Sequence, residues 1–319
     1  MDIGGSNVRT IIYYIDEKKF SDINTYRYVS KLNVNEEISA NVDASIEKIL
    51  LDKSGDELIG IGISLAACFE RDSGIITKWP NNPKWNSFPI LQYLKERFHV
   101  PVMLEDDANC AALGEQAFGS GRGVRNFVYI TISTGIGCGI VINNELLLGE
   151  HGLAGEFGHI WALNGKRAEN CSCGGIGCLQ TIASGKGILK RFHNTTTFKN
   201  LCSVEKEKCT AKKIFDLSIE GNPEAQRIVS SAGYYLGREI CNLVMLLDVP
   251  LIILGGGVIE SKEAILPYIN QGMEDALRGR REVQIICSDL KGCNGLFGAV
   301  IMAEKKQNKC LAMNINANC

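Results

Sequence analysis

Three groups of residues between positions 104 and 180 have side chains whose types and spacing fit a chemical role. The first is a pair of adjacent carboxylates at Asp106 and Asp107. The second is the glycine-rich turn 133–139, and the third is a histidine followed by three cysteines within 159–178. Each group alone is weak evidence. Together they predict phosphoryl transfer from a nucleotide to a small polar substrate, a reaction that depends on positioned phosphates and an oriented hydroxyl.

The carboxylate pair lies where an apolar run, 100–104, meets a predicted helix over 107–118. An aspartate at a helix start is a common N-cap, which explains one of the two but not readily both together with Glu105. The helix N-terminus is expected to keep an aspartate ionised and therefore weakly basic at neutral pH. That suffices for phosphoryl transfer, because the base mainly orients the hydroxyl and accepts its proton late. We expect Asp107 to be the catalytic base.

Three glycine-rich turns at 2–7, 132–139 and 255–257, each placed where a strand would end, are suited to bind a nucleotide. Glycine lets backbone N–H groups approach phosphate oxygens, and the hydroxyls of Ser6 and Thr134 add donors. A carboxylate in the first turn would hold Mg²⁺ directly or through water. The third turn suits adenine and its ribose, although an ordinary β-turn is the alternative for any single one. The residues expected to bind ATP and Mg²⁺ are Asp2, Gly4, Gly5, Ser6, Asn7, Thr134, Gly135, Gly256 and Gly257.

Other nucleotide-binding patterns are missing from the sequence. No turn matches the P-loop pattern, and no G-x-G-x-x-G opens a helix with an acid about twenty residues later, as a dinucleotide enzyme requires. Because Met1 directly precedes Asp2, we expect no room for a strand ahead of the first turn.

The histidine and cysteines have the spacing of a metal site. His159, Cys171, Cys173 and Cys178 form His-x11-Cys-x-Cys-x4-Cys, and three thiolates with one imidazole suit tetrahedral Zn²⁺. Since all four positions are filled by protein, the predicted zinc is structural. Scattered structural cysteines are the alternative.

Glu156 lies in a segment rich in glycine, alanine and phenylalanine, where a carboxylate without compensation is costly. Binding sugar hydroxyls would satisfy it, and a salt bridge is the alternative.

The elements that position these groups alternate between strand-like and helical segments. Strand-like runs are expected at 8–15, 58–65, 100–104, 127–132, 138–142, 251–254 and 283–286, and helices at 41–51, 89–98, 107–118 and 223–247. This order predicts an α/β fold with largely parallel strands. The polar, poorly periodic segment 192–213 is expected to be a surface insertion.

The bulk properties limit the class of protein. A chain of 319 residues with 45% hydrophobic content suits two lobes, and a net charge of −2 gives no electrostatic reason to expect nucleic acid or membrane as a partner. No signal peptide or spanning apolar run is present, so a cytoplasmic protein is expected. In that compartment the thirteen cysteines are expected to be reduced and available to metal.

Over nearly the whole chain these residues resemble the ROK family of bacterial sugar kinases and related repressors. The resemblance is carried by Asp2–Asn7, Leu104–Glu115, Ser133–Gly139, Glu156-Phe-Gly-His159 with Cys171–Cys178, Asp248–Val258 and Gly298–Ala303. It implies a two-lobed actin-like, ribonuclease H-like fold with ATP and sugar in the cleft between the lobes. We expect a smaller lobe over 1–117, completed by a C-terminal helix at about 298–319, and a larger lobe over 118–297.

The resemblance also implies an activity and further site residues. Members transfer the γ-phosphate of ATP to a sugar hydroxyl, typically O6 of a hexose, with glucose as the default. By this analogy Asp107 is the base, and the sugar contacts are Asn81, Asp106, Glu156, His159, Ala67 and Gln180. His159 would use one ring nitrogen for zinc and the other for the sugar. A homodimer is also implied.

Three departures from the family pattern bear on the sugar. Asp106 stands where members usually have Asn, Gln180 where they generally have Glu, and Ala66-Ala67 where they show Pro-Gly. A sugar-responsive repressor is one alternative, although repressors have a DNA-binding domain ahead of this region, and here only Met1 precedes Asp2. A sugar-binding protein without catalysis is the other.

Overall fold

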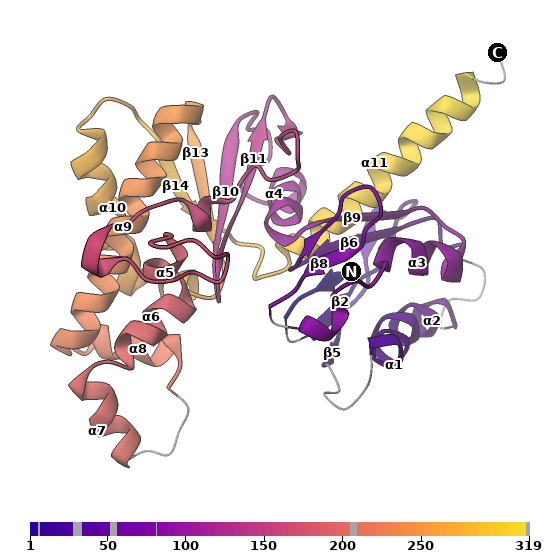
Figure 1. Ribbon diagram of the computed structural model, residues 1–319. Helices are drawn as coiled ribbons and strands as arrows, with labels where there is room; N and C mark the ends of the chain where they lie inside the picture. The colour runs from indigo at the N-terminus through magenta and orange to yellow at the C-terminus, as the bar shows by residue number, and fades with distance from the viewer. Residues whose placement is uncertain (6, 28–33, 52–55, 81, 205–208, 317–319) are drawn as a thin grey trace. The chain divides into compact units, whose positions relative to one another are not determined.

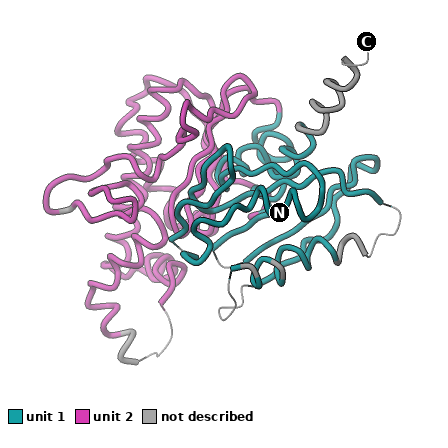
Figure 2. Tube along the Cα trace, turned by 45° about the vertical axis from the view of Figure 1, so that its right-hand side comes forward, with its two compact units in different colours: residues 1–122, 293–319 teal, residues 123–292 magenta. Residues whose placement is uncertain are grey.

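The computed structural model describes residues 1–5, 7–27, 34–51, 56–80, 82–204 and 209–316. The chain forms two compact units (Figure 2): unit 1 comprises residues 1–122 and 293–319, and unit 2 comprises residues 123–292. Unit 1 is thus built from both ends of the chain, whereas unit 2 is continuous. The sequence prediction placed the divisions at 117/118 and 297/298.

Unit 1 contains a five-stranded sheet in the order β5-β2-β1-β6-β9 (Figure 1). Its strands are β1 (Asp2–Ile3), β2 (Asn7–Thr10), β5 (Asn24–Arg27), β6 (Ile61–Leu65) and β9 (Val102–Asp106). The expectation that no strand precedes the first glycine turn is wrong. Two residues suffice, because β1 pairs with β2 on one side and with β6 on the other.

Unit 2 contains a second five-stranded sheet in the order β12-β11-β10-β13-β14. Its strands are β10 (Phe127–Ile132), β11 (Ile136–Ile142), β12 (Glu145–Leu146), β13 (Leu251–Gly255) and β14 (Gln284–Cys287). In chain order both sheets therefore follow one scheme: the first strand is central, the second and third extend to one side, and the last two to the other.

The prediction of largely parallel strands is wrong, because half of the pairings in each sheet are antiparallel. In unit 1 the pairs β1–β2 and β2–β5 are antiparallel, and in unit 2 the pairs β10–β11 and β11–β12 are. Part of the reason lies in the first two glycine turns: each connects two successive strands directly (β1 with β2, and β10 with β11), and so short a connection can join only antiparallel neighbours. The predicted phosphate turns are therefore hairpin turns.

The long helices pack by close backbone approach. In unit 1, α11 (Asn294–Asn316) lies along α4 (Asp107–Phe118), and a Cβ at Gly298 would come within 1.7 Å of the Cys110 carbonyl oxygen. In unit 2, α10 (Lys262–Leu277) packs against α9 (Pro223–Leu247). The predicted bounds of α4 and α9 are confirmed. Asn222 caps α9 through its side chain, and α9 ends at Asp248 in the left-handed conformation.

The remaining elements are shorter. The helices are α1 (Val34–Ile38), a π-helical turn (Ser39–Asp43), α2 (Ala44–Leu51), α3 (Ile90–Phe98), α5 (Gln180–Ala183), α6 (Gly185–Phe192), α7 (Thr196–Val204) and α8 (Ala211–Ile219). Two small hairpins pair β3 (Tyr13–Tyr14) with β4 (Lys19–Phe20) and β7 (Cys68–Phe69) with β8 (Ile76–Lys78). Single 3₁₀ turns occur at Pro83–Trp85, Phe157–His159, Gly165–Arg167 and Ile259–Ser261. None of the helices within the described residues is long and apolar enough to cross a membrane.

The expectation of a surface insertion over 192–213 is wrong. Phe192 is fully buried at the end of α6, Phe198 on α7 packs against the core of unit 2, and α8 begins within the same segment. Residues 205–208 lie outside the described part of the chain. Each of these short helices has few buried apolar residues among many polar ones, so the sequence shows no clear helical periodicity.

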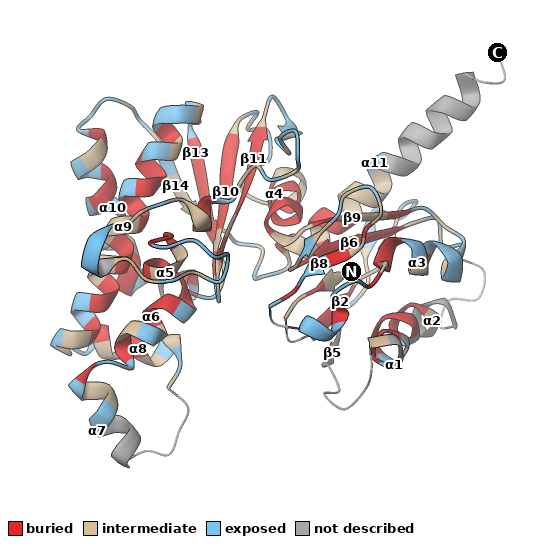
Figure 3. Cartoon of the chain, in the orientation of Figure 1, coloured by how far each residue is buried: buried red, intermediate tan, exposed pale blue. Residues whose placement is uncertain are grey.

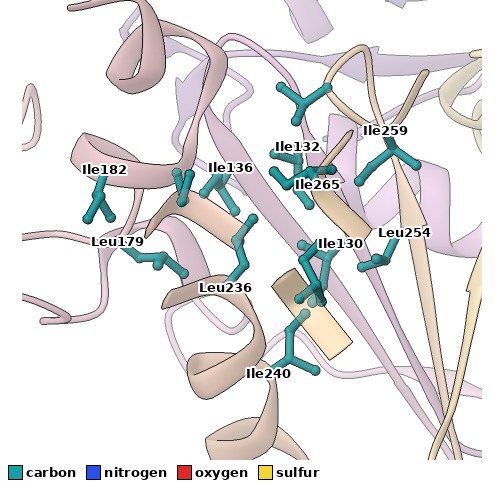
Figure 4. Close-up of a cluster of buried hydrophobic side chains, with 14 of the residues drawn as sticks. Ile130, Ile132, Ile136, Leu179, Ile182, Leu236, Ile240, Leu254, Ile259 and Ile265 are labelled. Atoms are coloured by element: carbon teal, nitrogen blue, oxygen red, sulfur yellow. The ribbon is translucent and has the colours of Figure 1, made fainter. Parts of the chain in front are cut away.

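Each unit has its own apolar core. Strands β10, β11 and β13 of unit 2 are buried along most of their length (Figure 3). Ile130, Ile132 and Leu254 from the sheet gather with Leu236 and Ile240 from α9 (Figure 4). A rigid sheet of this kind holds the turns at its ends in fixed positions, which is where the predicted site residues lie.

Candidate functional site

The end of β9 brings three acids of unit 1 together. Asp106 is the N-cap of α4, and its Oδ1 accepts from the Ala108 N–H at 3.0 Å. Glu105 is buried and receives both guanidinium nitrogens of Arg71, at 2.7 and 2.9 Å. It also accepts from the Asp106 N–H at 2.9 Å and from Asn109 Nδ2 at 3.0 Å. Two of the three acids thus have structural partners that explain their presence.

Asp107, the third acid, is the first residue of α4 and is only partly exposed. Burial raises its pKa well above the ordinary range, and the negative charges of Asp106 and Asp2 raise it further. The backbone N–H groups of Asp107 and Ala108 oppose this but do not outweigh it. The expectation that the helix start keeps Asp107 a weak base is therefore wrong. Its carboxylate is a stronger base than an ordinary aspartate, which suits a proton acceptor.

Asp2 lies on the strand next to β6, opposite Ser64, and Ser64 in turn lies opposite Glu105. Its Oδ2 accepts from Arg9 at 2.5 and 3.1 Å, and its Oδ1 accepts from Ser64 Oγ at 2.9 Å. The carboxylate is therefore fixed in place at the first glycine turn, which a hydrogen bond from the Gly4 N–H to the carbonyl of Asn7 closes at 3.0 Å.

The other unit 1 residues expected at the site lie around these strand ends. Gly4, Gly5 and Asn7 are partly exposed in and after the first turn, and Ala67 is partly exposed just beyond β6. Ser6 and Asn81 lie outside the described residues.

In unit 2 two of the predicted nucleotide turns leave neighbouring strands together. Thr131 on β10 pairs with Gly255 on β13, so the turn with Thr134 and Gly135 lies next to the turn with Gly256 and Gly257. The Val258 N–H donates to the Ile132 carbonyl at 3.0 Å and joins the two turns. Gly256 has a φ of +89°, and a Cβ there would come within 2.5 Å of the Ile132 carbonyl oxygen. Only glycine fits this position.

A cavity of about 740 Å³ lies against these two turns within unit 2. Ser133, Thr134, Gly257 and Val258 line it on one side. The other lining residues come from α6 and the residue after it, from α7, and from α8 and the two residues before it, and they are Gly185, Lys186, Leu189, His193, Phe198, Cys209, Thr210, Ala211, Lys212 and Phe215. Apolar walls together with two lysines, in a cavity of the size of small-molecule sites, suit a nucleotide.

The four predicted metal ligands come together in the segment between β12 and α5. One ligand atom from each of His159, Cys171, Cys173 and Cys178 lies within 4.8 Å of all the others. His159 Nδ1 is 3.5 Å from Cys171 Sγ, and the sulfurs of Cys173 and Cys178 are 3.7 Å apart.

These separations fit zinc. Tetrahedral Zn²⁺ with bonds of about 2.3 Å to sulfur and about 2.05 Å to nitrogen requires ligand separations of about 3.8 Å for S–S and about 3.6 Å for S–N. Burial raises the pKa of the Cys171 thiol, but the Cys173 N–H, the Gln180 amide and the neighbouring thiols outweigh burial and lower that pKa to about 6. Burial and the neighbouring thiols raise the pKa of Cys178 to about 12, so the separations of the four ligand atoms, and not the thiol pKa values, carry the fit to zinc.

The ring nitrogen of His159 on the side away from Cys171 lies near Glu156. Nε2 of His159 is 3.8 Å from a carboxylate oxygen of Glu156, whose side chain is 59% exposed. The premise that Glu156 is an uncompensated acid in an apolar segment is therefore wrong, because water reaches it. The separation of 3.8 Å is longer than a hydrogen bond, so the two side chains lie near each other without being joined directly.

Sequence reasoning missed the cations that hold the acids. Arg71 binds Glu105 across 34 residues, and Arg9 binds Asp2 across the β1–β2 hairpin. The sequence signal for these cations was the run of three acids at the end of β9, because a buried carboxylate requires a partner. Lys186 in the cavity was also missed, because α6 itself was not predicted.

Comparison with known proteins places the chain among sugar kinases and their relatives. A family model described as "ROK family" matches residues 1–306. The chain is 37% identical over 244 residues to a glucokinase of Halalkalibacterium halodurans, across 74% of this chain and 73% of that protein. It is also 33% identical over 213 residues to a xylose repressor of Bacillus spizizenii, across 66% of this chain but 52% of the repressor.

Solved structures show the same architecture. A ROK hexokinase from Thermus thermophilus matches with a TM-score of 0.81 at 28% identity, covering 97% of this chain and 98% of that one. A ROK family glucokinase from Streptomyces griseus, solved in complex with glucose and AMPPNP, matches with a TM-score of 0.78 at 27% identity, covering 95% and 98%. The predicted two-lobed actin-like α/β fold is confirmed.

Proposed function

The chain belongs to the ROK family, and from this premise we propose that it is an ATP-dependent hexose kinase. It transfers the γ-phosphate of ATP to a sugar hydroxyl, O6 of glucose or a related hexose. The observation that carries the proposal is Asp107, a partly buried carboxylate of raised pKa at the start of α4. The similarity to a glucokinase that binds glucose and AMPPNP supports the choice of substrates.

In the proposed reaction, Asp107 accepts a hydrogen bond from the sugar hydroxyl and orients its oxygen toward the γ-phosphate. As the bond between the sugar oxygen and the γ-phosphorus forms, the hydroxyl proton passes to Asp107. The bond between the γ-phosphorus and the oxygen that bridges it to the β-phosphate breaks, and ADP leaves with that electron pair. Asp106 is held by its capping bond and keeps the start of α4 in place.

Mg²⁺ is implied by this chemistry, and the acids fit it. Burial raises the pKa of Asp107 most, and the negative charges of Asp106 and Asp2 raise it further; a divalent cation would offset those charges. When bound, Mg²⁺ neutralises phosphate charge during transfer. Asp2, fixed by Arg9 and Ser64, is the proposed residue that holds it, with Asn7 and the glycines of the first turn nearby.

The cavity of unit 2 is the proposed nucleotide site. Thr134 and Gly135 would receive phosphate oxygens, while Gly256 and Gly257 would lie against adenosine. Lys186, exposed and lining this cavity beside Thr134, adds positive charge where phosphates are expected.

A structural zinc is proposed for His159, Cys171, Cys173 and Cys178, supported by their separations. Because all four ligands come from the protein, the ion has no open position. It fixes the wall that carries Glu156 and His159, which we propose as sugar contacts together with Asn81, Asp106 and Ala67.

A second candidate function is a sugar-responsive regulator or a sugar-binding protein without catalysis. The similarity to a xylose repressor favours it, since that protein shares this region. Retention of Asp107 with a raised pKa favours the kinase, because a sensor has no use for a base.

The deciding experiment is ADP release from ATP and Mg²⁺ across a panel of hexoses and N-acetylhexosamines. We expect release with one or two sugars, with glucose first. A protein that binds a sugar by calorimetry but releases no ADP with any of them would contradict the kinase and support the second candidate.

The assembly and compartment are proposals of smaller weight. We propose a cytoplasmic homodimer, by analogy with the family. Light scattering coupled to size exclusion tests the dimer, and a mass of 34.9 kDa would contradict it.

A further inference from the structure

The chain crosses from one unit to the other twice, after Arg122 and before Cys293. On the unit 1 side, both crossings are bound by one residue, Glu115, in the last turn of α4. Its Oε2 accepts from the Ser120 N–H at 2.8 Å, just before the first crossing. Its Oε1 accepts from Asn294 Nδ2 at 2.6 Å, just after the second. One side chain therefore joins two segments that lie far apart in the sequence.

The backbone of Glu115 binds the first crossing as well. Its carbonyl accepts from the Gly119 N–H and from the Gly121 N–H, both at 3.1 Å. With the side-chain bond to Ser120, three successive N–H groups after α4 donate to Glu115. The first crossing is therefore held as far as Gly121, and the next residue, Arg122, is exposed.

A carboxylate at this position requires a reason beyond the helix itself. Glu115 is fully buried in the last turn of α4, where both burial and the negative end of the helix dipole disfavour an ionised side chain. The Ser120 N–H and the Asn294 amide, which face its two oxygens, are both donors. A carboxylate accepts at both oxygens, whereas a glutamine amide accepts at only one. The side-chain type thus matches the two segments that it binds.

The start of α11, which Asn294 forms, lies close to α4 and to the proposed Mg²⁺ ligand. A Cβ at Gly114 would come within 2.3 Å of the Asn294 carbonyl oxygen. A Cβ at Gly295 would come within 2.8 Å of Ser64 Oγ and 3.3 Å of Asp2 Oδ1. These two oxygens form the hydrogen bond that helps to fix Asp2. A shift of the α11 start would therefore disturb the position of Asp2.

We propose that Glu115 is a positioning residue for phosphoryl transfer: it binds both crossings and thereby holds the start of α11 against Ser64 and Asp2. The binding of the two crossings depends on unit 1 alone. The effect on the reaction rests on the function proposed above, in which Asp2 holds Mg²⁺. The two parts of the proposal are therefore tested by different measurements.

The first test is limited trypsin digestion of the whole protein, because Arg122 and Lys291 are exposed trypsin sites at the two crossings. Glu115→Gln loses one acceptor and is expected to raise the rate of cleavage after both residues about 10-fold, since cleavage follows the population of locally open chain. The matched control is Glu37→Gln, because Glu37 is also a fully buried glutamate of unit 1 with two partners, at 2.7 and 2.8 Å. Its rates at the two sites should stay within about twofold of the wild type.

A double variant tests the bond between Glu115 and Asn294. Asn294→Asp alone sets two carboxylates against each other and should raise cleavage more than Glu115→Gln does. When both changes are combined, the glutamine amide donates to the new aspartate while its oxygen accepts from the Ser120 N–H. Cleavage should then return to within about threefold of the wild type. Asn294→Ala, which removes the donor and leaves α4 unchanged, should raise cleavage about 3- to 10-fold and replaces Glu115→Gln if that variant does not fold.

Steady-state kinetics test the effect on Asp2. Glu115→Gln should lower kcat about 10-fold and raise the Mg²⁺ concentration for half-maximal rate about threefold, with the KM for sugar within about twofold of the wild type. The double variant should restore both values, and Glu37→Gln should leave them unchanged. A role limited to stability would lower the unfolding temperature without changing the Mg²⁺ dependence.

The outcomes separate the parts of the proposal. Cleavage and kcat of Glu115→Gln that both stay within about twofold of the wild type would overturn it entirely. A double variant cleaved as fast as Asn294→Asp would overturn the role of the bond to Asn294. Raised cleavage with unchanged kcat and Mg²⁺ dependence would overturn the effect on Asp2. A wild type that phosphorylates no sugar would contradict the proposed function, while the trypsin rates would still decide whether Glu115 binds both crossings.

Discussion

The two units contain sheets with the same strand order but carry different residues at the strand ends. Each has a central first strand with two antiparallel neighbours on one side and two parallel ones on the other. In unit 1 the strand ends carry Asp2, Asp106 and Asp107. In unit 2 the corresponding hairpin carries Thr134 and Gly135, and a cavity with lysines lies against it. The fold is therefore a shared frame, and chemistry follows from the residues at the strand ends.

The units also differ in what stabilises them. Unit 1 contains ion pairs whose acids are buried: Glu105 binds Arg71, and the fully buried Glu37 binds Lys84 at 2.8 Å. Unit 2 has a larger apolar core and, in the proposed metal site, a crosslink of four side chains. Changes in the two units should accordingly fail in different ways.

The largest expected effect is on catalysis by unit 1. Asp107→Asn should lower kcat by about 10²- to 10⁴-fold, since the proton acceptor is lost, and leave sugar affinity within about twofold. Steady-state kinetics and calorimetry measure the two. Asp72→Asn, an exposed aspartate of the same unit, is the control. Equal kcat values for the two variants would show that Asp107 takes no part in the reaction.

The next effect is on the stability of unit 2. Cys173→Ala should abolish stoichiometric zinc and lower the free energy of unfolding by several kcal/mol, on the order expected when a structural metal is lost. Metal analysis and thermal unfolding measure it, with Cys68→Ala in unit 1 as the control. Unchanged zinc content would refute the Cys₃His site.

Loss of the cation under Glu105 should weaken unit 1. Arg71→Gln leaves a buried carboxylate without its bidentate partner and should cost about 2–3 kcal/mol of unfolding free energy. Arg97→Gln breaks a half-exposed pair with Glu47 and a longer contact of 3.8 Å with Asp43, and should cost about 1 kcal/mol or less. Urea unfolding compares them, and similar costs would show that Glu105 does not depend on Arg71.

Lys186 tests the cavity of unit 2. Lys186→Gln should raise the KM for ATP about fivefold, the equivalent of about 1 kcal/mol for one exposed charge on phosphate. Lys190→Gln is the matched control: it lies one turn later on α6, pairs with Glu169 at 2.6 Å and does not line the cavity. An equal rise of the KM for ATP in both variants would mean that the effect comes from the lost net charge and not from the position of Lys186.

The smallest expected effect is the pH dependence of stability due to Asp107. The folded pKa of Asp107 lies above its unfolded value, so between the two values the folded state binds more protons. Stability is then lost as pH rises through this window. Asp107→Asn should therefore unfold at slightly higher temperature than the wild type at pH 7, and the gain should vanish below the unfolded pKa, about 3.9. A gain independent of pH would contradict the raised pKa.

Sequence reasoning worked where signals were local. The bounds of α9 follow from the pair Asn222-Pro223 at its start and from Asp248, two residues before a proline, at its end. The metal ligands lie within twenty residues, so their spacing alone predicted the cluster that the structure brings together.

The features that sequence reasoning missed depend on distant partners. The raised pKa of Asp107 could not be inferred, because burial, its largest cause, arises only in the folded chain. The smaller effect of Asp2 adds to that of the adjacent Asp106, and Asp2 comes close only through the pairing of β1 with β6 and of β6 with β9. The antiparallel hairpins were hidden because a glycine turn has the same composition in either kind of connection. The helices within 192–213 escaped because each has few apolar anchors.

The split of unit 1 between the two chain ends sets an order of events during synthesis. Unit 2 is a continuous stretch, so it can complete its core once residue 292 has left the ribosome. Unit 1 begins first but waits for α11, which packs on α4 and β6. The usual order, in which the N-terminal domain folds first, is thus reversed. Until α11 has left the ribosome, the nascent chain exposes the apolar surface of α4 and β6 that α11 will cover, and this surface is where a chaperone is expected to bind.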